Sequence, residues 1–87
     1  FGIIAFAAPS IARQRRALAA MGVEARLAGH IALNLPMETL TDPVAPRGAL
    51  CDAAKRLVAD GAEAVILGCA GMAGHRAAVE AACGVPV

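Results

Sequence analysis

The chain contains almost no aromatic residues: it has two phenylalanines and neither tyrosine nor tryptophan. Proteins that bind single-stranded nucleic acid stack bases on aromatic side chains beside basic residues, and this sequence offers no such arrangement. Its charge is also nearly balanced, with 8 Lys and Arg against 7 Asp and Glu. Binding to nucleic acid or to an anionic membrane draws on a larger excess of positive charge. We therefore expect neither nucleic acid nor a membrane as a partner.

Cysteine is sparse, and its spacing argues against two common roles. The three cysteines are Cys51, Cys69 and Cys83. An odd number without paired spacing argues against a disulfide scaffold and fits a reducing cytoplasm. None of them forms a close ligand pair with another cysteine or with His30 or His75, so we expect no metal site. No apolar run approaches the roughly 20 residues of a membrane helix. We therefore expect a cytoplasmic protein.

The length of the chain allows one small domain with a modest core, because 87 residues bury a limited share of their surface. The sequence has no initiator methionine, and its last residues, 85–87, have the character of a strand that is beginning. We expect residues 1–87 to be a single α/β lobe of a longer polypeptide.

Apolar strand-like runs alternate with helical patterns along the chain. Strands are predicted at residues 2–6, 28–35 and 64–67, with another beginning at Val85. Helices are predicted at 9–22, 47–60 and 73–83. In the first, an apolar stripe is formed by Ile11, Leu18 and Met21. In the second, the residues expected to face the core are Leu50, Ala54, Leu57 and Val58. Residues 37–46 are a connecting loop with room for a short helical turn. The alternation predicts a three-layer α/β sandwich, a Rossmann-like lobe with a parallel sheet and helices on both faces.

Cys69 is the candidate functional residue. It follows the apolar run Val65–Leu67, and glycines on both sides of it let the backbone turn towards the last helix. This places the thiol at the carboxyl end of a parallel strand, where ligand crevices of α/β sheets lie. The backbone N–H groups of Ala70, Gly71 and Met72 are expected to face a thiolate or a substrate oxyanion.

Other interpretations of these residues stay open. Free cysteine is often a small buried hydrophobe, and no partner base stands beside Cys69 in the sequence. The glycine spacing does not match a dinucleotide-binding fingerprint. We expect His75 on the surface, His30 structural or at a sheet edge, and Arg76 either solvated or paired with a substrate carboxylate. Cys51 and Cys83 are expected to be packing residues.

Two motifs carry a family resemblance. Residues 67–72 read Leu-Gly-Cys-Ala-Gly-Met and residues 84–87 read Gly-Val-Pro-Val, after Asp-Gly-Ala-Glu-Ala at 60–64. With the opening strand at 1–4 and the corner Asn34-Leu35-Pro36, they occur in the order typical of the Asp/Glu/hydantoin racemase family. The chain resembles that family, most closely its hydantoin and allantoin racemase branch.

The resemblance implies a two-lobe enzyme that uses neither pyridoxal phosphate nor metal. Each lobe contributes one cysteine, because inversion at carbon needs a base on one face and an acid on the other. Cys69 matches the cysteine of the second lobe, and the other catalytic cysteine belongs upstream, in the remaining lobe. The backbone of Ala70 and Gly71 is implied to hold the substrate carbonyl or its enolate, and Met72 is a further candidate from its place in the same turn. The partners implied are a small-molecule substrate, the remaining lobe and a second copy in a homo-oligomer.

Two departures from the family pattern bear on the substrate. Ala5 and Phe6 stand where relatives often carry hydroxyl residues, which makes an expected substrate contact more apolar. Ala70-Gly71 replaces the Thr-His type of loop found in glutamate racemases, which disfavours an amino-acid substrate. The alternatives are an aspartate/glutamate-type racemase, a related isomerase or decarboxylase in which Cys69 is a covalent nucleophile, and a non-catalytic small-molecule or anion-binding lobe.

Overall fold

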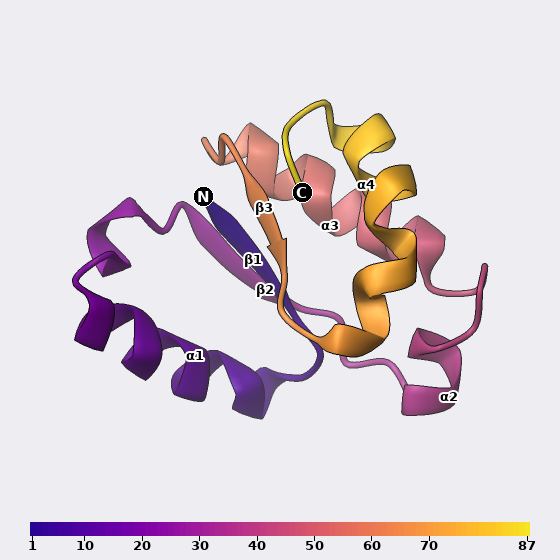
Figure 1. Cartoon of the computed structure of the whole chain (residues 1–87), viewed down its shortest axis with the longest axis horizontal. Coiled ribbons are helices and arrows are strands. Elements are labelled where there is room, and N and C mark those ends of the chain that lie inside the picture. The colour runs from indigo at the N-terminus through magenta and orange to yellow at the C-terminus, as the bar shows by residue number, and fades with distance from the viewer.

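The fold is built on a three-stranded parallel sheet in the order β2–β1–β3, seen in a computed structural model that describes residues 1–87 (Figure 1). The strands are β1 (Gly2–Ala5), β2 (Gly29–Ala32) and β3 (Val65–Leu67). Every residue of β1 is buried, as expected for a central strand made of small and aliphatic side chains. The carboxyl ends of the three strands lie at one edge of the sheet, because all pairings are parallel.

Helices cover both faces of this sheet. Helix α1 (Ala8–Met21) lies on one face, and α3 (Arg47–Ala59) and α4 (Arg76–Cys83) lie on the other (Figure 1). Short helical turns connect them: η1 (Glu24–Arg26), α2 (Met37–Leu40) and η2 (Ala70–His75). The expected α/β architecture with a parallel sheet between helical layers is confirmed. No helix of the chain combines the length and the apolar character needed to cross a membrane.

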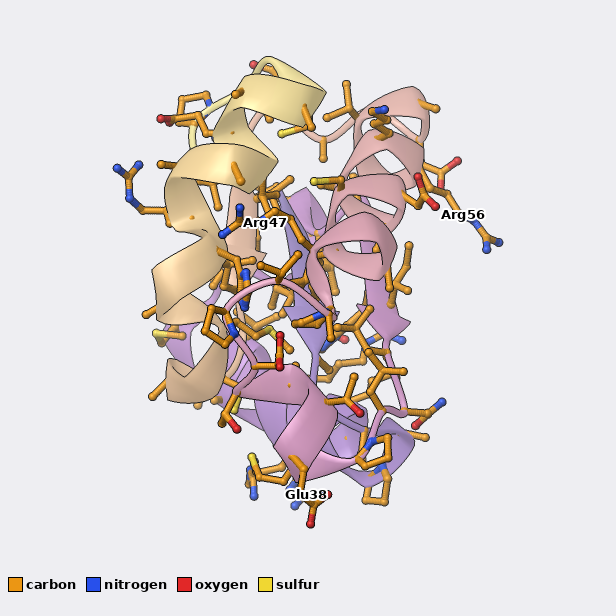
Figure 2. The ribbon with its side chains drawn as sticks, turned by 90° about the vertical axis from the view of Figure 1, so that its right-hand side faces the viewer. Glu38, Arg47 and Arg56 are labelled. Atoms are coloured by element: carbon orange, nitrogen blue, oxygen red, sulfur yellow. The ribbon has the colours of Figure 1, made fainter.

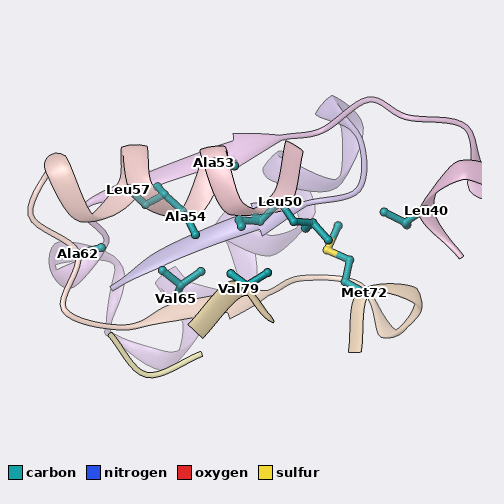
Figure 3. Close-up of a cluster of buried hydrophobic side chains, with 10 residues drawn as sticks. Leu40, Leu50, Ala53, Ala54, Leu57, Ala62, Val65, Met72 and Val79 are labelled. Carbon is teal, nitrogen blue, oxygen red and sulfur yellow. The ribbon is translucent and has the colours of Figure 1, made fainter. Parts of the chain in front are cut away.

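The hydrophobic core lies between the sheet and the α3/α4 layer (Figure 3). Its ten buried residues are Ile4, Leu40, Leu50, Ala53, Ala54, Leu57, Ala62, Val65, Met72 and Val79. Helix α3 approaches the sheet closely because Gly2 and Gly29, paired in register on β1 and β2, leave a notch for Leu57. A Cβ atom on either glycine would lie within 3.0 Å of the Leu57 side chain.

The sequence patterns locate most elements, although the second strand spans only Gly29–Ala32 instead of the predicted 28–35. Three further expectations need correction. The pattern over 47–60 gave the correct helix, since Leu50, Ala54 and Leu57 are all buried. The stripe on α1 is narrower than expected, because Met21 is 66% exposed at the last helical residue and only Leu18 is buried. No strand forms at 85–87, although the Pro86 carbonyl accepts a hydrogen bond from the Val65 N–H at 2.9 Å. The third correction concerns the last helix and is described with the site.

Candidate active site

Cys69 lies at the carboxyl end of β3, two residues beyond Leu67, the last residue of the strand, as the sequence predicts. Its backbone is extended, and it is the residue that caps η2. The side chain is half-buried, packs against the hydrophobic core and makes no hydrogen bond with another side chain. It lines a hollow of about 210 Å³ together with Leu67, Ala70, Ala73, Arg76 and Val87. The thiol therefore faces a small and mainly apolar space.

The turn after Cys69 is a 3-10 turn rather than the start of an α-helix. Residues 70–75 form η2, and α4 begins only at Arg76, so the expected helix from Ala73 starts too early. Gly71 and Gly74 lie within this segment, and glycine disfavours the α-helical backbone. The first hydrogen bond of the turn joins the Met72 N–H to the Cys69 carbonyl at 3.0 Å. The N–H groups of Ala70 and Gly71 come before this first bond, so they have no carbonyl partner within the turn.

Three of the residues expected to contact the substrate do not line the hollow at Cys69. Met72 is fully buried in the core, between Leu50 and Leu40 in Figure 3, and its N–H is already bonded to Cys69. Ala5 is also fully buried, because it ends the central strand. Phe6 is half-buried against the core and does not line the hollow at Cys69. Met72 and Ala5 are therefore core residues, and the expected substrate contacts that remain beside Cys69 are Ala70 and Gly71.

A side-chain network holds the residue before Cys69. The Gly68 N–H donates to the Ile4 carbonyl at 2.8 Å, and the Gly68 carbonyl accepts from Gln14 Nε2 at 3.1 Å. Because Gln14 Nε2 is the donor here, Gln14 Oε1 is the acceptor for His30 Nε2 at 2.6 Å. Gly68 has no room for a side chain, since a Cβ atom would lie 2.8 Å from both the Ile4 carbonyl and Gln14 Nε2.

The surroundings of His30 favour the neutral form of its imidazole. Burial, together with the positive charge of Arg15, lowers the pKa of the His30 imidazole below its usual 6.5. Its Nδ1 is enclosed without a partner, which disfavours a second proton on the ring. His30 lies on β2, an edge strand of the sheet, which is one of the two positions expected for it. Sequence analysis missed Gln14, because a single polar residue on a helix carries no periodic or motif signal.

The remaining candidates divide between surface and core. His75 is only 3% exposed, so the expectation of a surface position is wrong; the 3-10 turn carries its ring inward at the junction with α4. Arg76 is exposed and its Nη1 lies 3.2 Å from Glu80 Oε2, one turn along α4. Cys51 and Cys83 pack against the core as expected. No three of the His, Cys, Asp and Glu residues lie together in an arrangement that could hold a metal ion.

The arrangement around Cys69 suits chemistry at a carbon next to a carbonyl. A thiol can exchange a proton with such a carbon, and N–H groups without internal partners can stabilise the oxygen on which negative charge develops. Cys69 has no hydrogen-bonded imidazole, so a Cys-His pair of the hydrolytic type is absent from this chain.

Comparison of the chain with known proteins gives a match to one family model. The model of the Asp/Glu/hydantoin racemase family matches residues 1–87. No curated protein and no solved structure matches the chain.

Proposed function

The chain belongs to the Asp/Glu/hydantoin racemase family, and we propose that Cys69 is one of the two acid/base groups with which a cofactor-independent racemase inverts an acidic carbon. Membership in the family implies racemase activity. The observation that carries the assignment to Cys69 is its place at the carboxyl end of β3, where its side chain lines a hollow and the N–H groups of Ala70 and Gly71 stand outside the turn.

In the proposed reaction the protons balance between two thiols. Cys69, as a thiolate, removes the proton from the acidic carbon on one face, and the bonding electrons move onto the adjacent carbonyl oxygen. A thiol on the opposite face then gives its proton to the same carbon. In the reverse direction Cys69 is the thiol that donates. The Ala70 and Gly71 N–H groups are the candidate donors to the oxygen while it carries negative charge.

We propose a hydantoin-like or allantoin-like ring as the substrate. The hollow at Cys69 is lined by apolar side chains except for Arg76, and Arg76 is paired with Glu80. A neutral ring has two carbonyls to accept hydrogen bonds and no carboxylate that needs a dedicated cation. A dicarboxylic amino acid would need such a cation, since an unpaired carboxylate is costly to bury.

The second thiol belongs, in this proposal, to another lobe of the same polypeptide. Cys51 and Cys83 cannot supply it, because both pack against the core on the α3/α4 side of the sheet. A single lobe presents Cys69 to one face of a carbon only, so a facing lobe completes the site.

The test is racemisation of a single hydantoin enantiomer, followed by chiral chromatography, in the full-length enzyme. We expect Cys69→Ala to lower the rate by about 10²- to 10⁴-fold, the range that a positioned general acid/base supplies. Cys83→Ala is the matched control, because it removes a half-buried thiol of α4 that does not line the hollow. Equal losses in both variants, or none in Cys69→Ala, would remove Cys69 from the reaction.

A further inference from the structure

A second hollow lies beside η2, and its lining shares no residue with the hollow that Cys69 lines. It has a volume of about 380 Å³ and, unlike the first, no hydrophobic residue in its lining. Its lining includes Thr41, Asp42, Arg47, Gly71, Gly74 and His75. These residues come from the loop after α2, from the first turn of α3 and from η2. A volume of this size exceeds that of several water molecules, so it has room for a small organic molecule.

His75 is an unpartnered polar side chain in this wall. Only 3% of the surface of His75 is exposed, yet its ring makes no hydrogen bond within the protein. Nδ1 is enclosed and has no hydrogen-bond partner in the protein. Buried polar groups are normally satisfied, and an unsatisfied one in a native fold calls for a partner that the protein itself does not supply.

Arg47 is a second side chain of this hollow with N–H groups that have no acceptor in the protein. Its guanidinium donates one hydrogen bond, from Nη2 to the Pro43 carbonyl at 3.0 Å, and it has no carboxylate partner. Its Nε is enclosed without an acceptor. In Figure 2, Arg47 lies between α3 and α4, whereas Arg56 of the same helix extends outward. A guanidinium presents several donors in one plane, and this one has most of them free.

Asp42 limits the charge of any ligand in this hollow. One oxygen of its carboxylate, Oδ1, accepts the N–H groups of Ala45 at 2.8 Å and Val44 at 2.9 Å. These two bonds, and to a lesser degree nearby His75, lower the pKa of the Asp42 carboxyl, so the group is ionised at neutral pH. Its negative charge offsets that of Arg47, and a ligand with two negative charges would be repelled.

We propose that this hollow binds the carboxylate group of a small organic monoacid, with its two oxygens accepting hydrogen bonds from the guanidinium of Arg47 and the imidazole of His75. A carboxylate is planar and has two acceptor oxygens, which matches two donors in the wall. A phosphate dianion needs more donors and meets the charge of Asp42. The site goes beyond the proposed racemase function and does not use Cys69.

Gly71 separates the two hollows. A Cβ atom on Gly71 would lie 3.7 Å from Cys69 Sγ and 3.6 Å from Thr41 Cγ2, so its Cα is in the wall between the thiol and the second hollow. An acid bound there contacts the turn that carries Cys69 without entering the space that Cys69 lines.

The test is a titration of the 15N-labelled chain with sodium butyrate at constant ionic strength, with sodium chloride and sodium phosphate as parallel arms. We expect saturable shifts of the Gly71, Gly74 and His75 signals with butyrate, none with chloride, and weaker binding of phosphate. His75→Gln and Arg47→Gln should each weaken butyrate binding by at least 10-fold. Arg56→Gln, an exposed arginine of the same helix, is the matched control and should bind as the wild type does.

Two further variants distinguish loss of binding from loss of folding, and this site from the racemase site. Arg47→Lys retains the charge and removes the planar donors, so it should also weaken binding even if His75→Gln does not fold. Cys69→Ser should bind butyrate normally, which separates this site from the racemase proposal. Shifts that do not saturate, phosphate binding tighter than butyrate, or full affinity in Arg47→Lys and Arg47→Gln would overturn the inference.

Discussion

The side-chain amide of Gln14 donates a hydrogen bond to the backbone carbonyl of Gly68 over 3.1 Å. The bond joins α1 to the residue between β3 and Cys69, across 54 positions of sequence. It fixes the direction in which the chain leaves the strand, and with it the place of the thiol. The contact also orients Gln14 towards His30, so helix, edge strand and turn are held as one unit.

Gln14→Leu should lower the free energy of unfolding by about 1–3 kcal/mol, because the Gly68 carbonyl and the His30 imidazole each lose a partner. Urea denaturation measures the change. Arg13→Leu alters an exposed neighbour on the same helix and should stay within about 0.5 kcal/mol of the wild type. If the two variants are equally stable, the network contributes nothing to the fold.

Gly68→Ala should destabilise the chain by about 1–3 kcal/mol, since the new methyl group would lie 2.8 Å from the Ile4 carbonyl and from Gln14 Nε2. Gly48→Ala is the paired control. Gly48 is exposed in the first turn of α3 with nothing within 4 Å of its Cβ position, so alanine there should stabilise by about 0.5–1 kcal/mol. Thermal unfolding of both variants gives the comparison, and a stable Gly68→Ala would contradict the close contact.

Met72→Ala should cost about 2–5 kcal/mol, because it empties a fully buried position between Leu50 and Leu40. Met72→Leu keeps most of the volume and should cost less than about 1.5 kcal/mol. Chemical denaturation distinguishes the two. A Met72→Ala protein as stable as the wild type would show that this side chain lies at the surface of the site.

His30 makes stability depend on pH. Its folded-state pKa lies below the usual 6.5, so between the two values the unfolded chain binds a proton that the folded chain does not. Stability should therefore fall as the pH drops through 6.5 towards the lowered folded-state pKa of His30. His30→Gln should flatten this part of the profile of unfolding free energy against pH. An unchanged slope would mean that His30 titrates alike in both states.

The sequence predicted the parts of the fold that depend on local pattern. Leu50, Ala54 and Leu57 repeat at helical spacing and are buried, and Gly22 ends α1 in the left-handed conformation that glycine favours. Cys69 was placed correctly because a short aliphatic run followed by glycine marks the end of a buried strand.

The positions that were wrong depend on contacts distant in sequence. Met72 was expected at the site from its place in the turn after β3 and Ala5 from the end of the first strand, and both are fully buried. His75 was expected at the surface because polar residues near helix starts usually are, but the 3-10 turn changes the direction of its ring. The Gln14–Gly68–His30 network joins three elements, and no sequence pattern within any one of them predicts it.

The most direct test of the role of Cys69 is solvent deuterium incorporation at the acidic ring carbon, measured separately for each hydantoin enantiomer in D2O. The full-length enzyme and its Cys69→Ser variant are compared. We predict that the wild type exchanges both enantiomers, and that the variant exchanges only one and no longer racemises either. Equal exchange of both enantiomers by the variant would show that Cys69 is not the base for one face of the carbon.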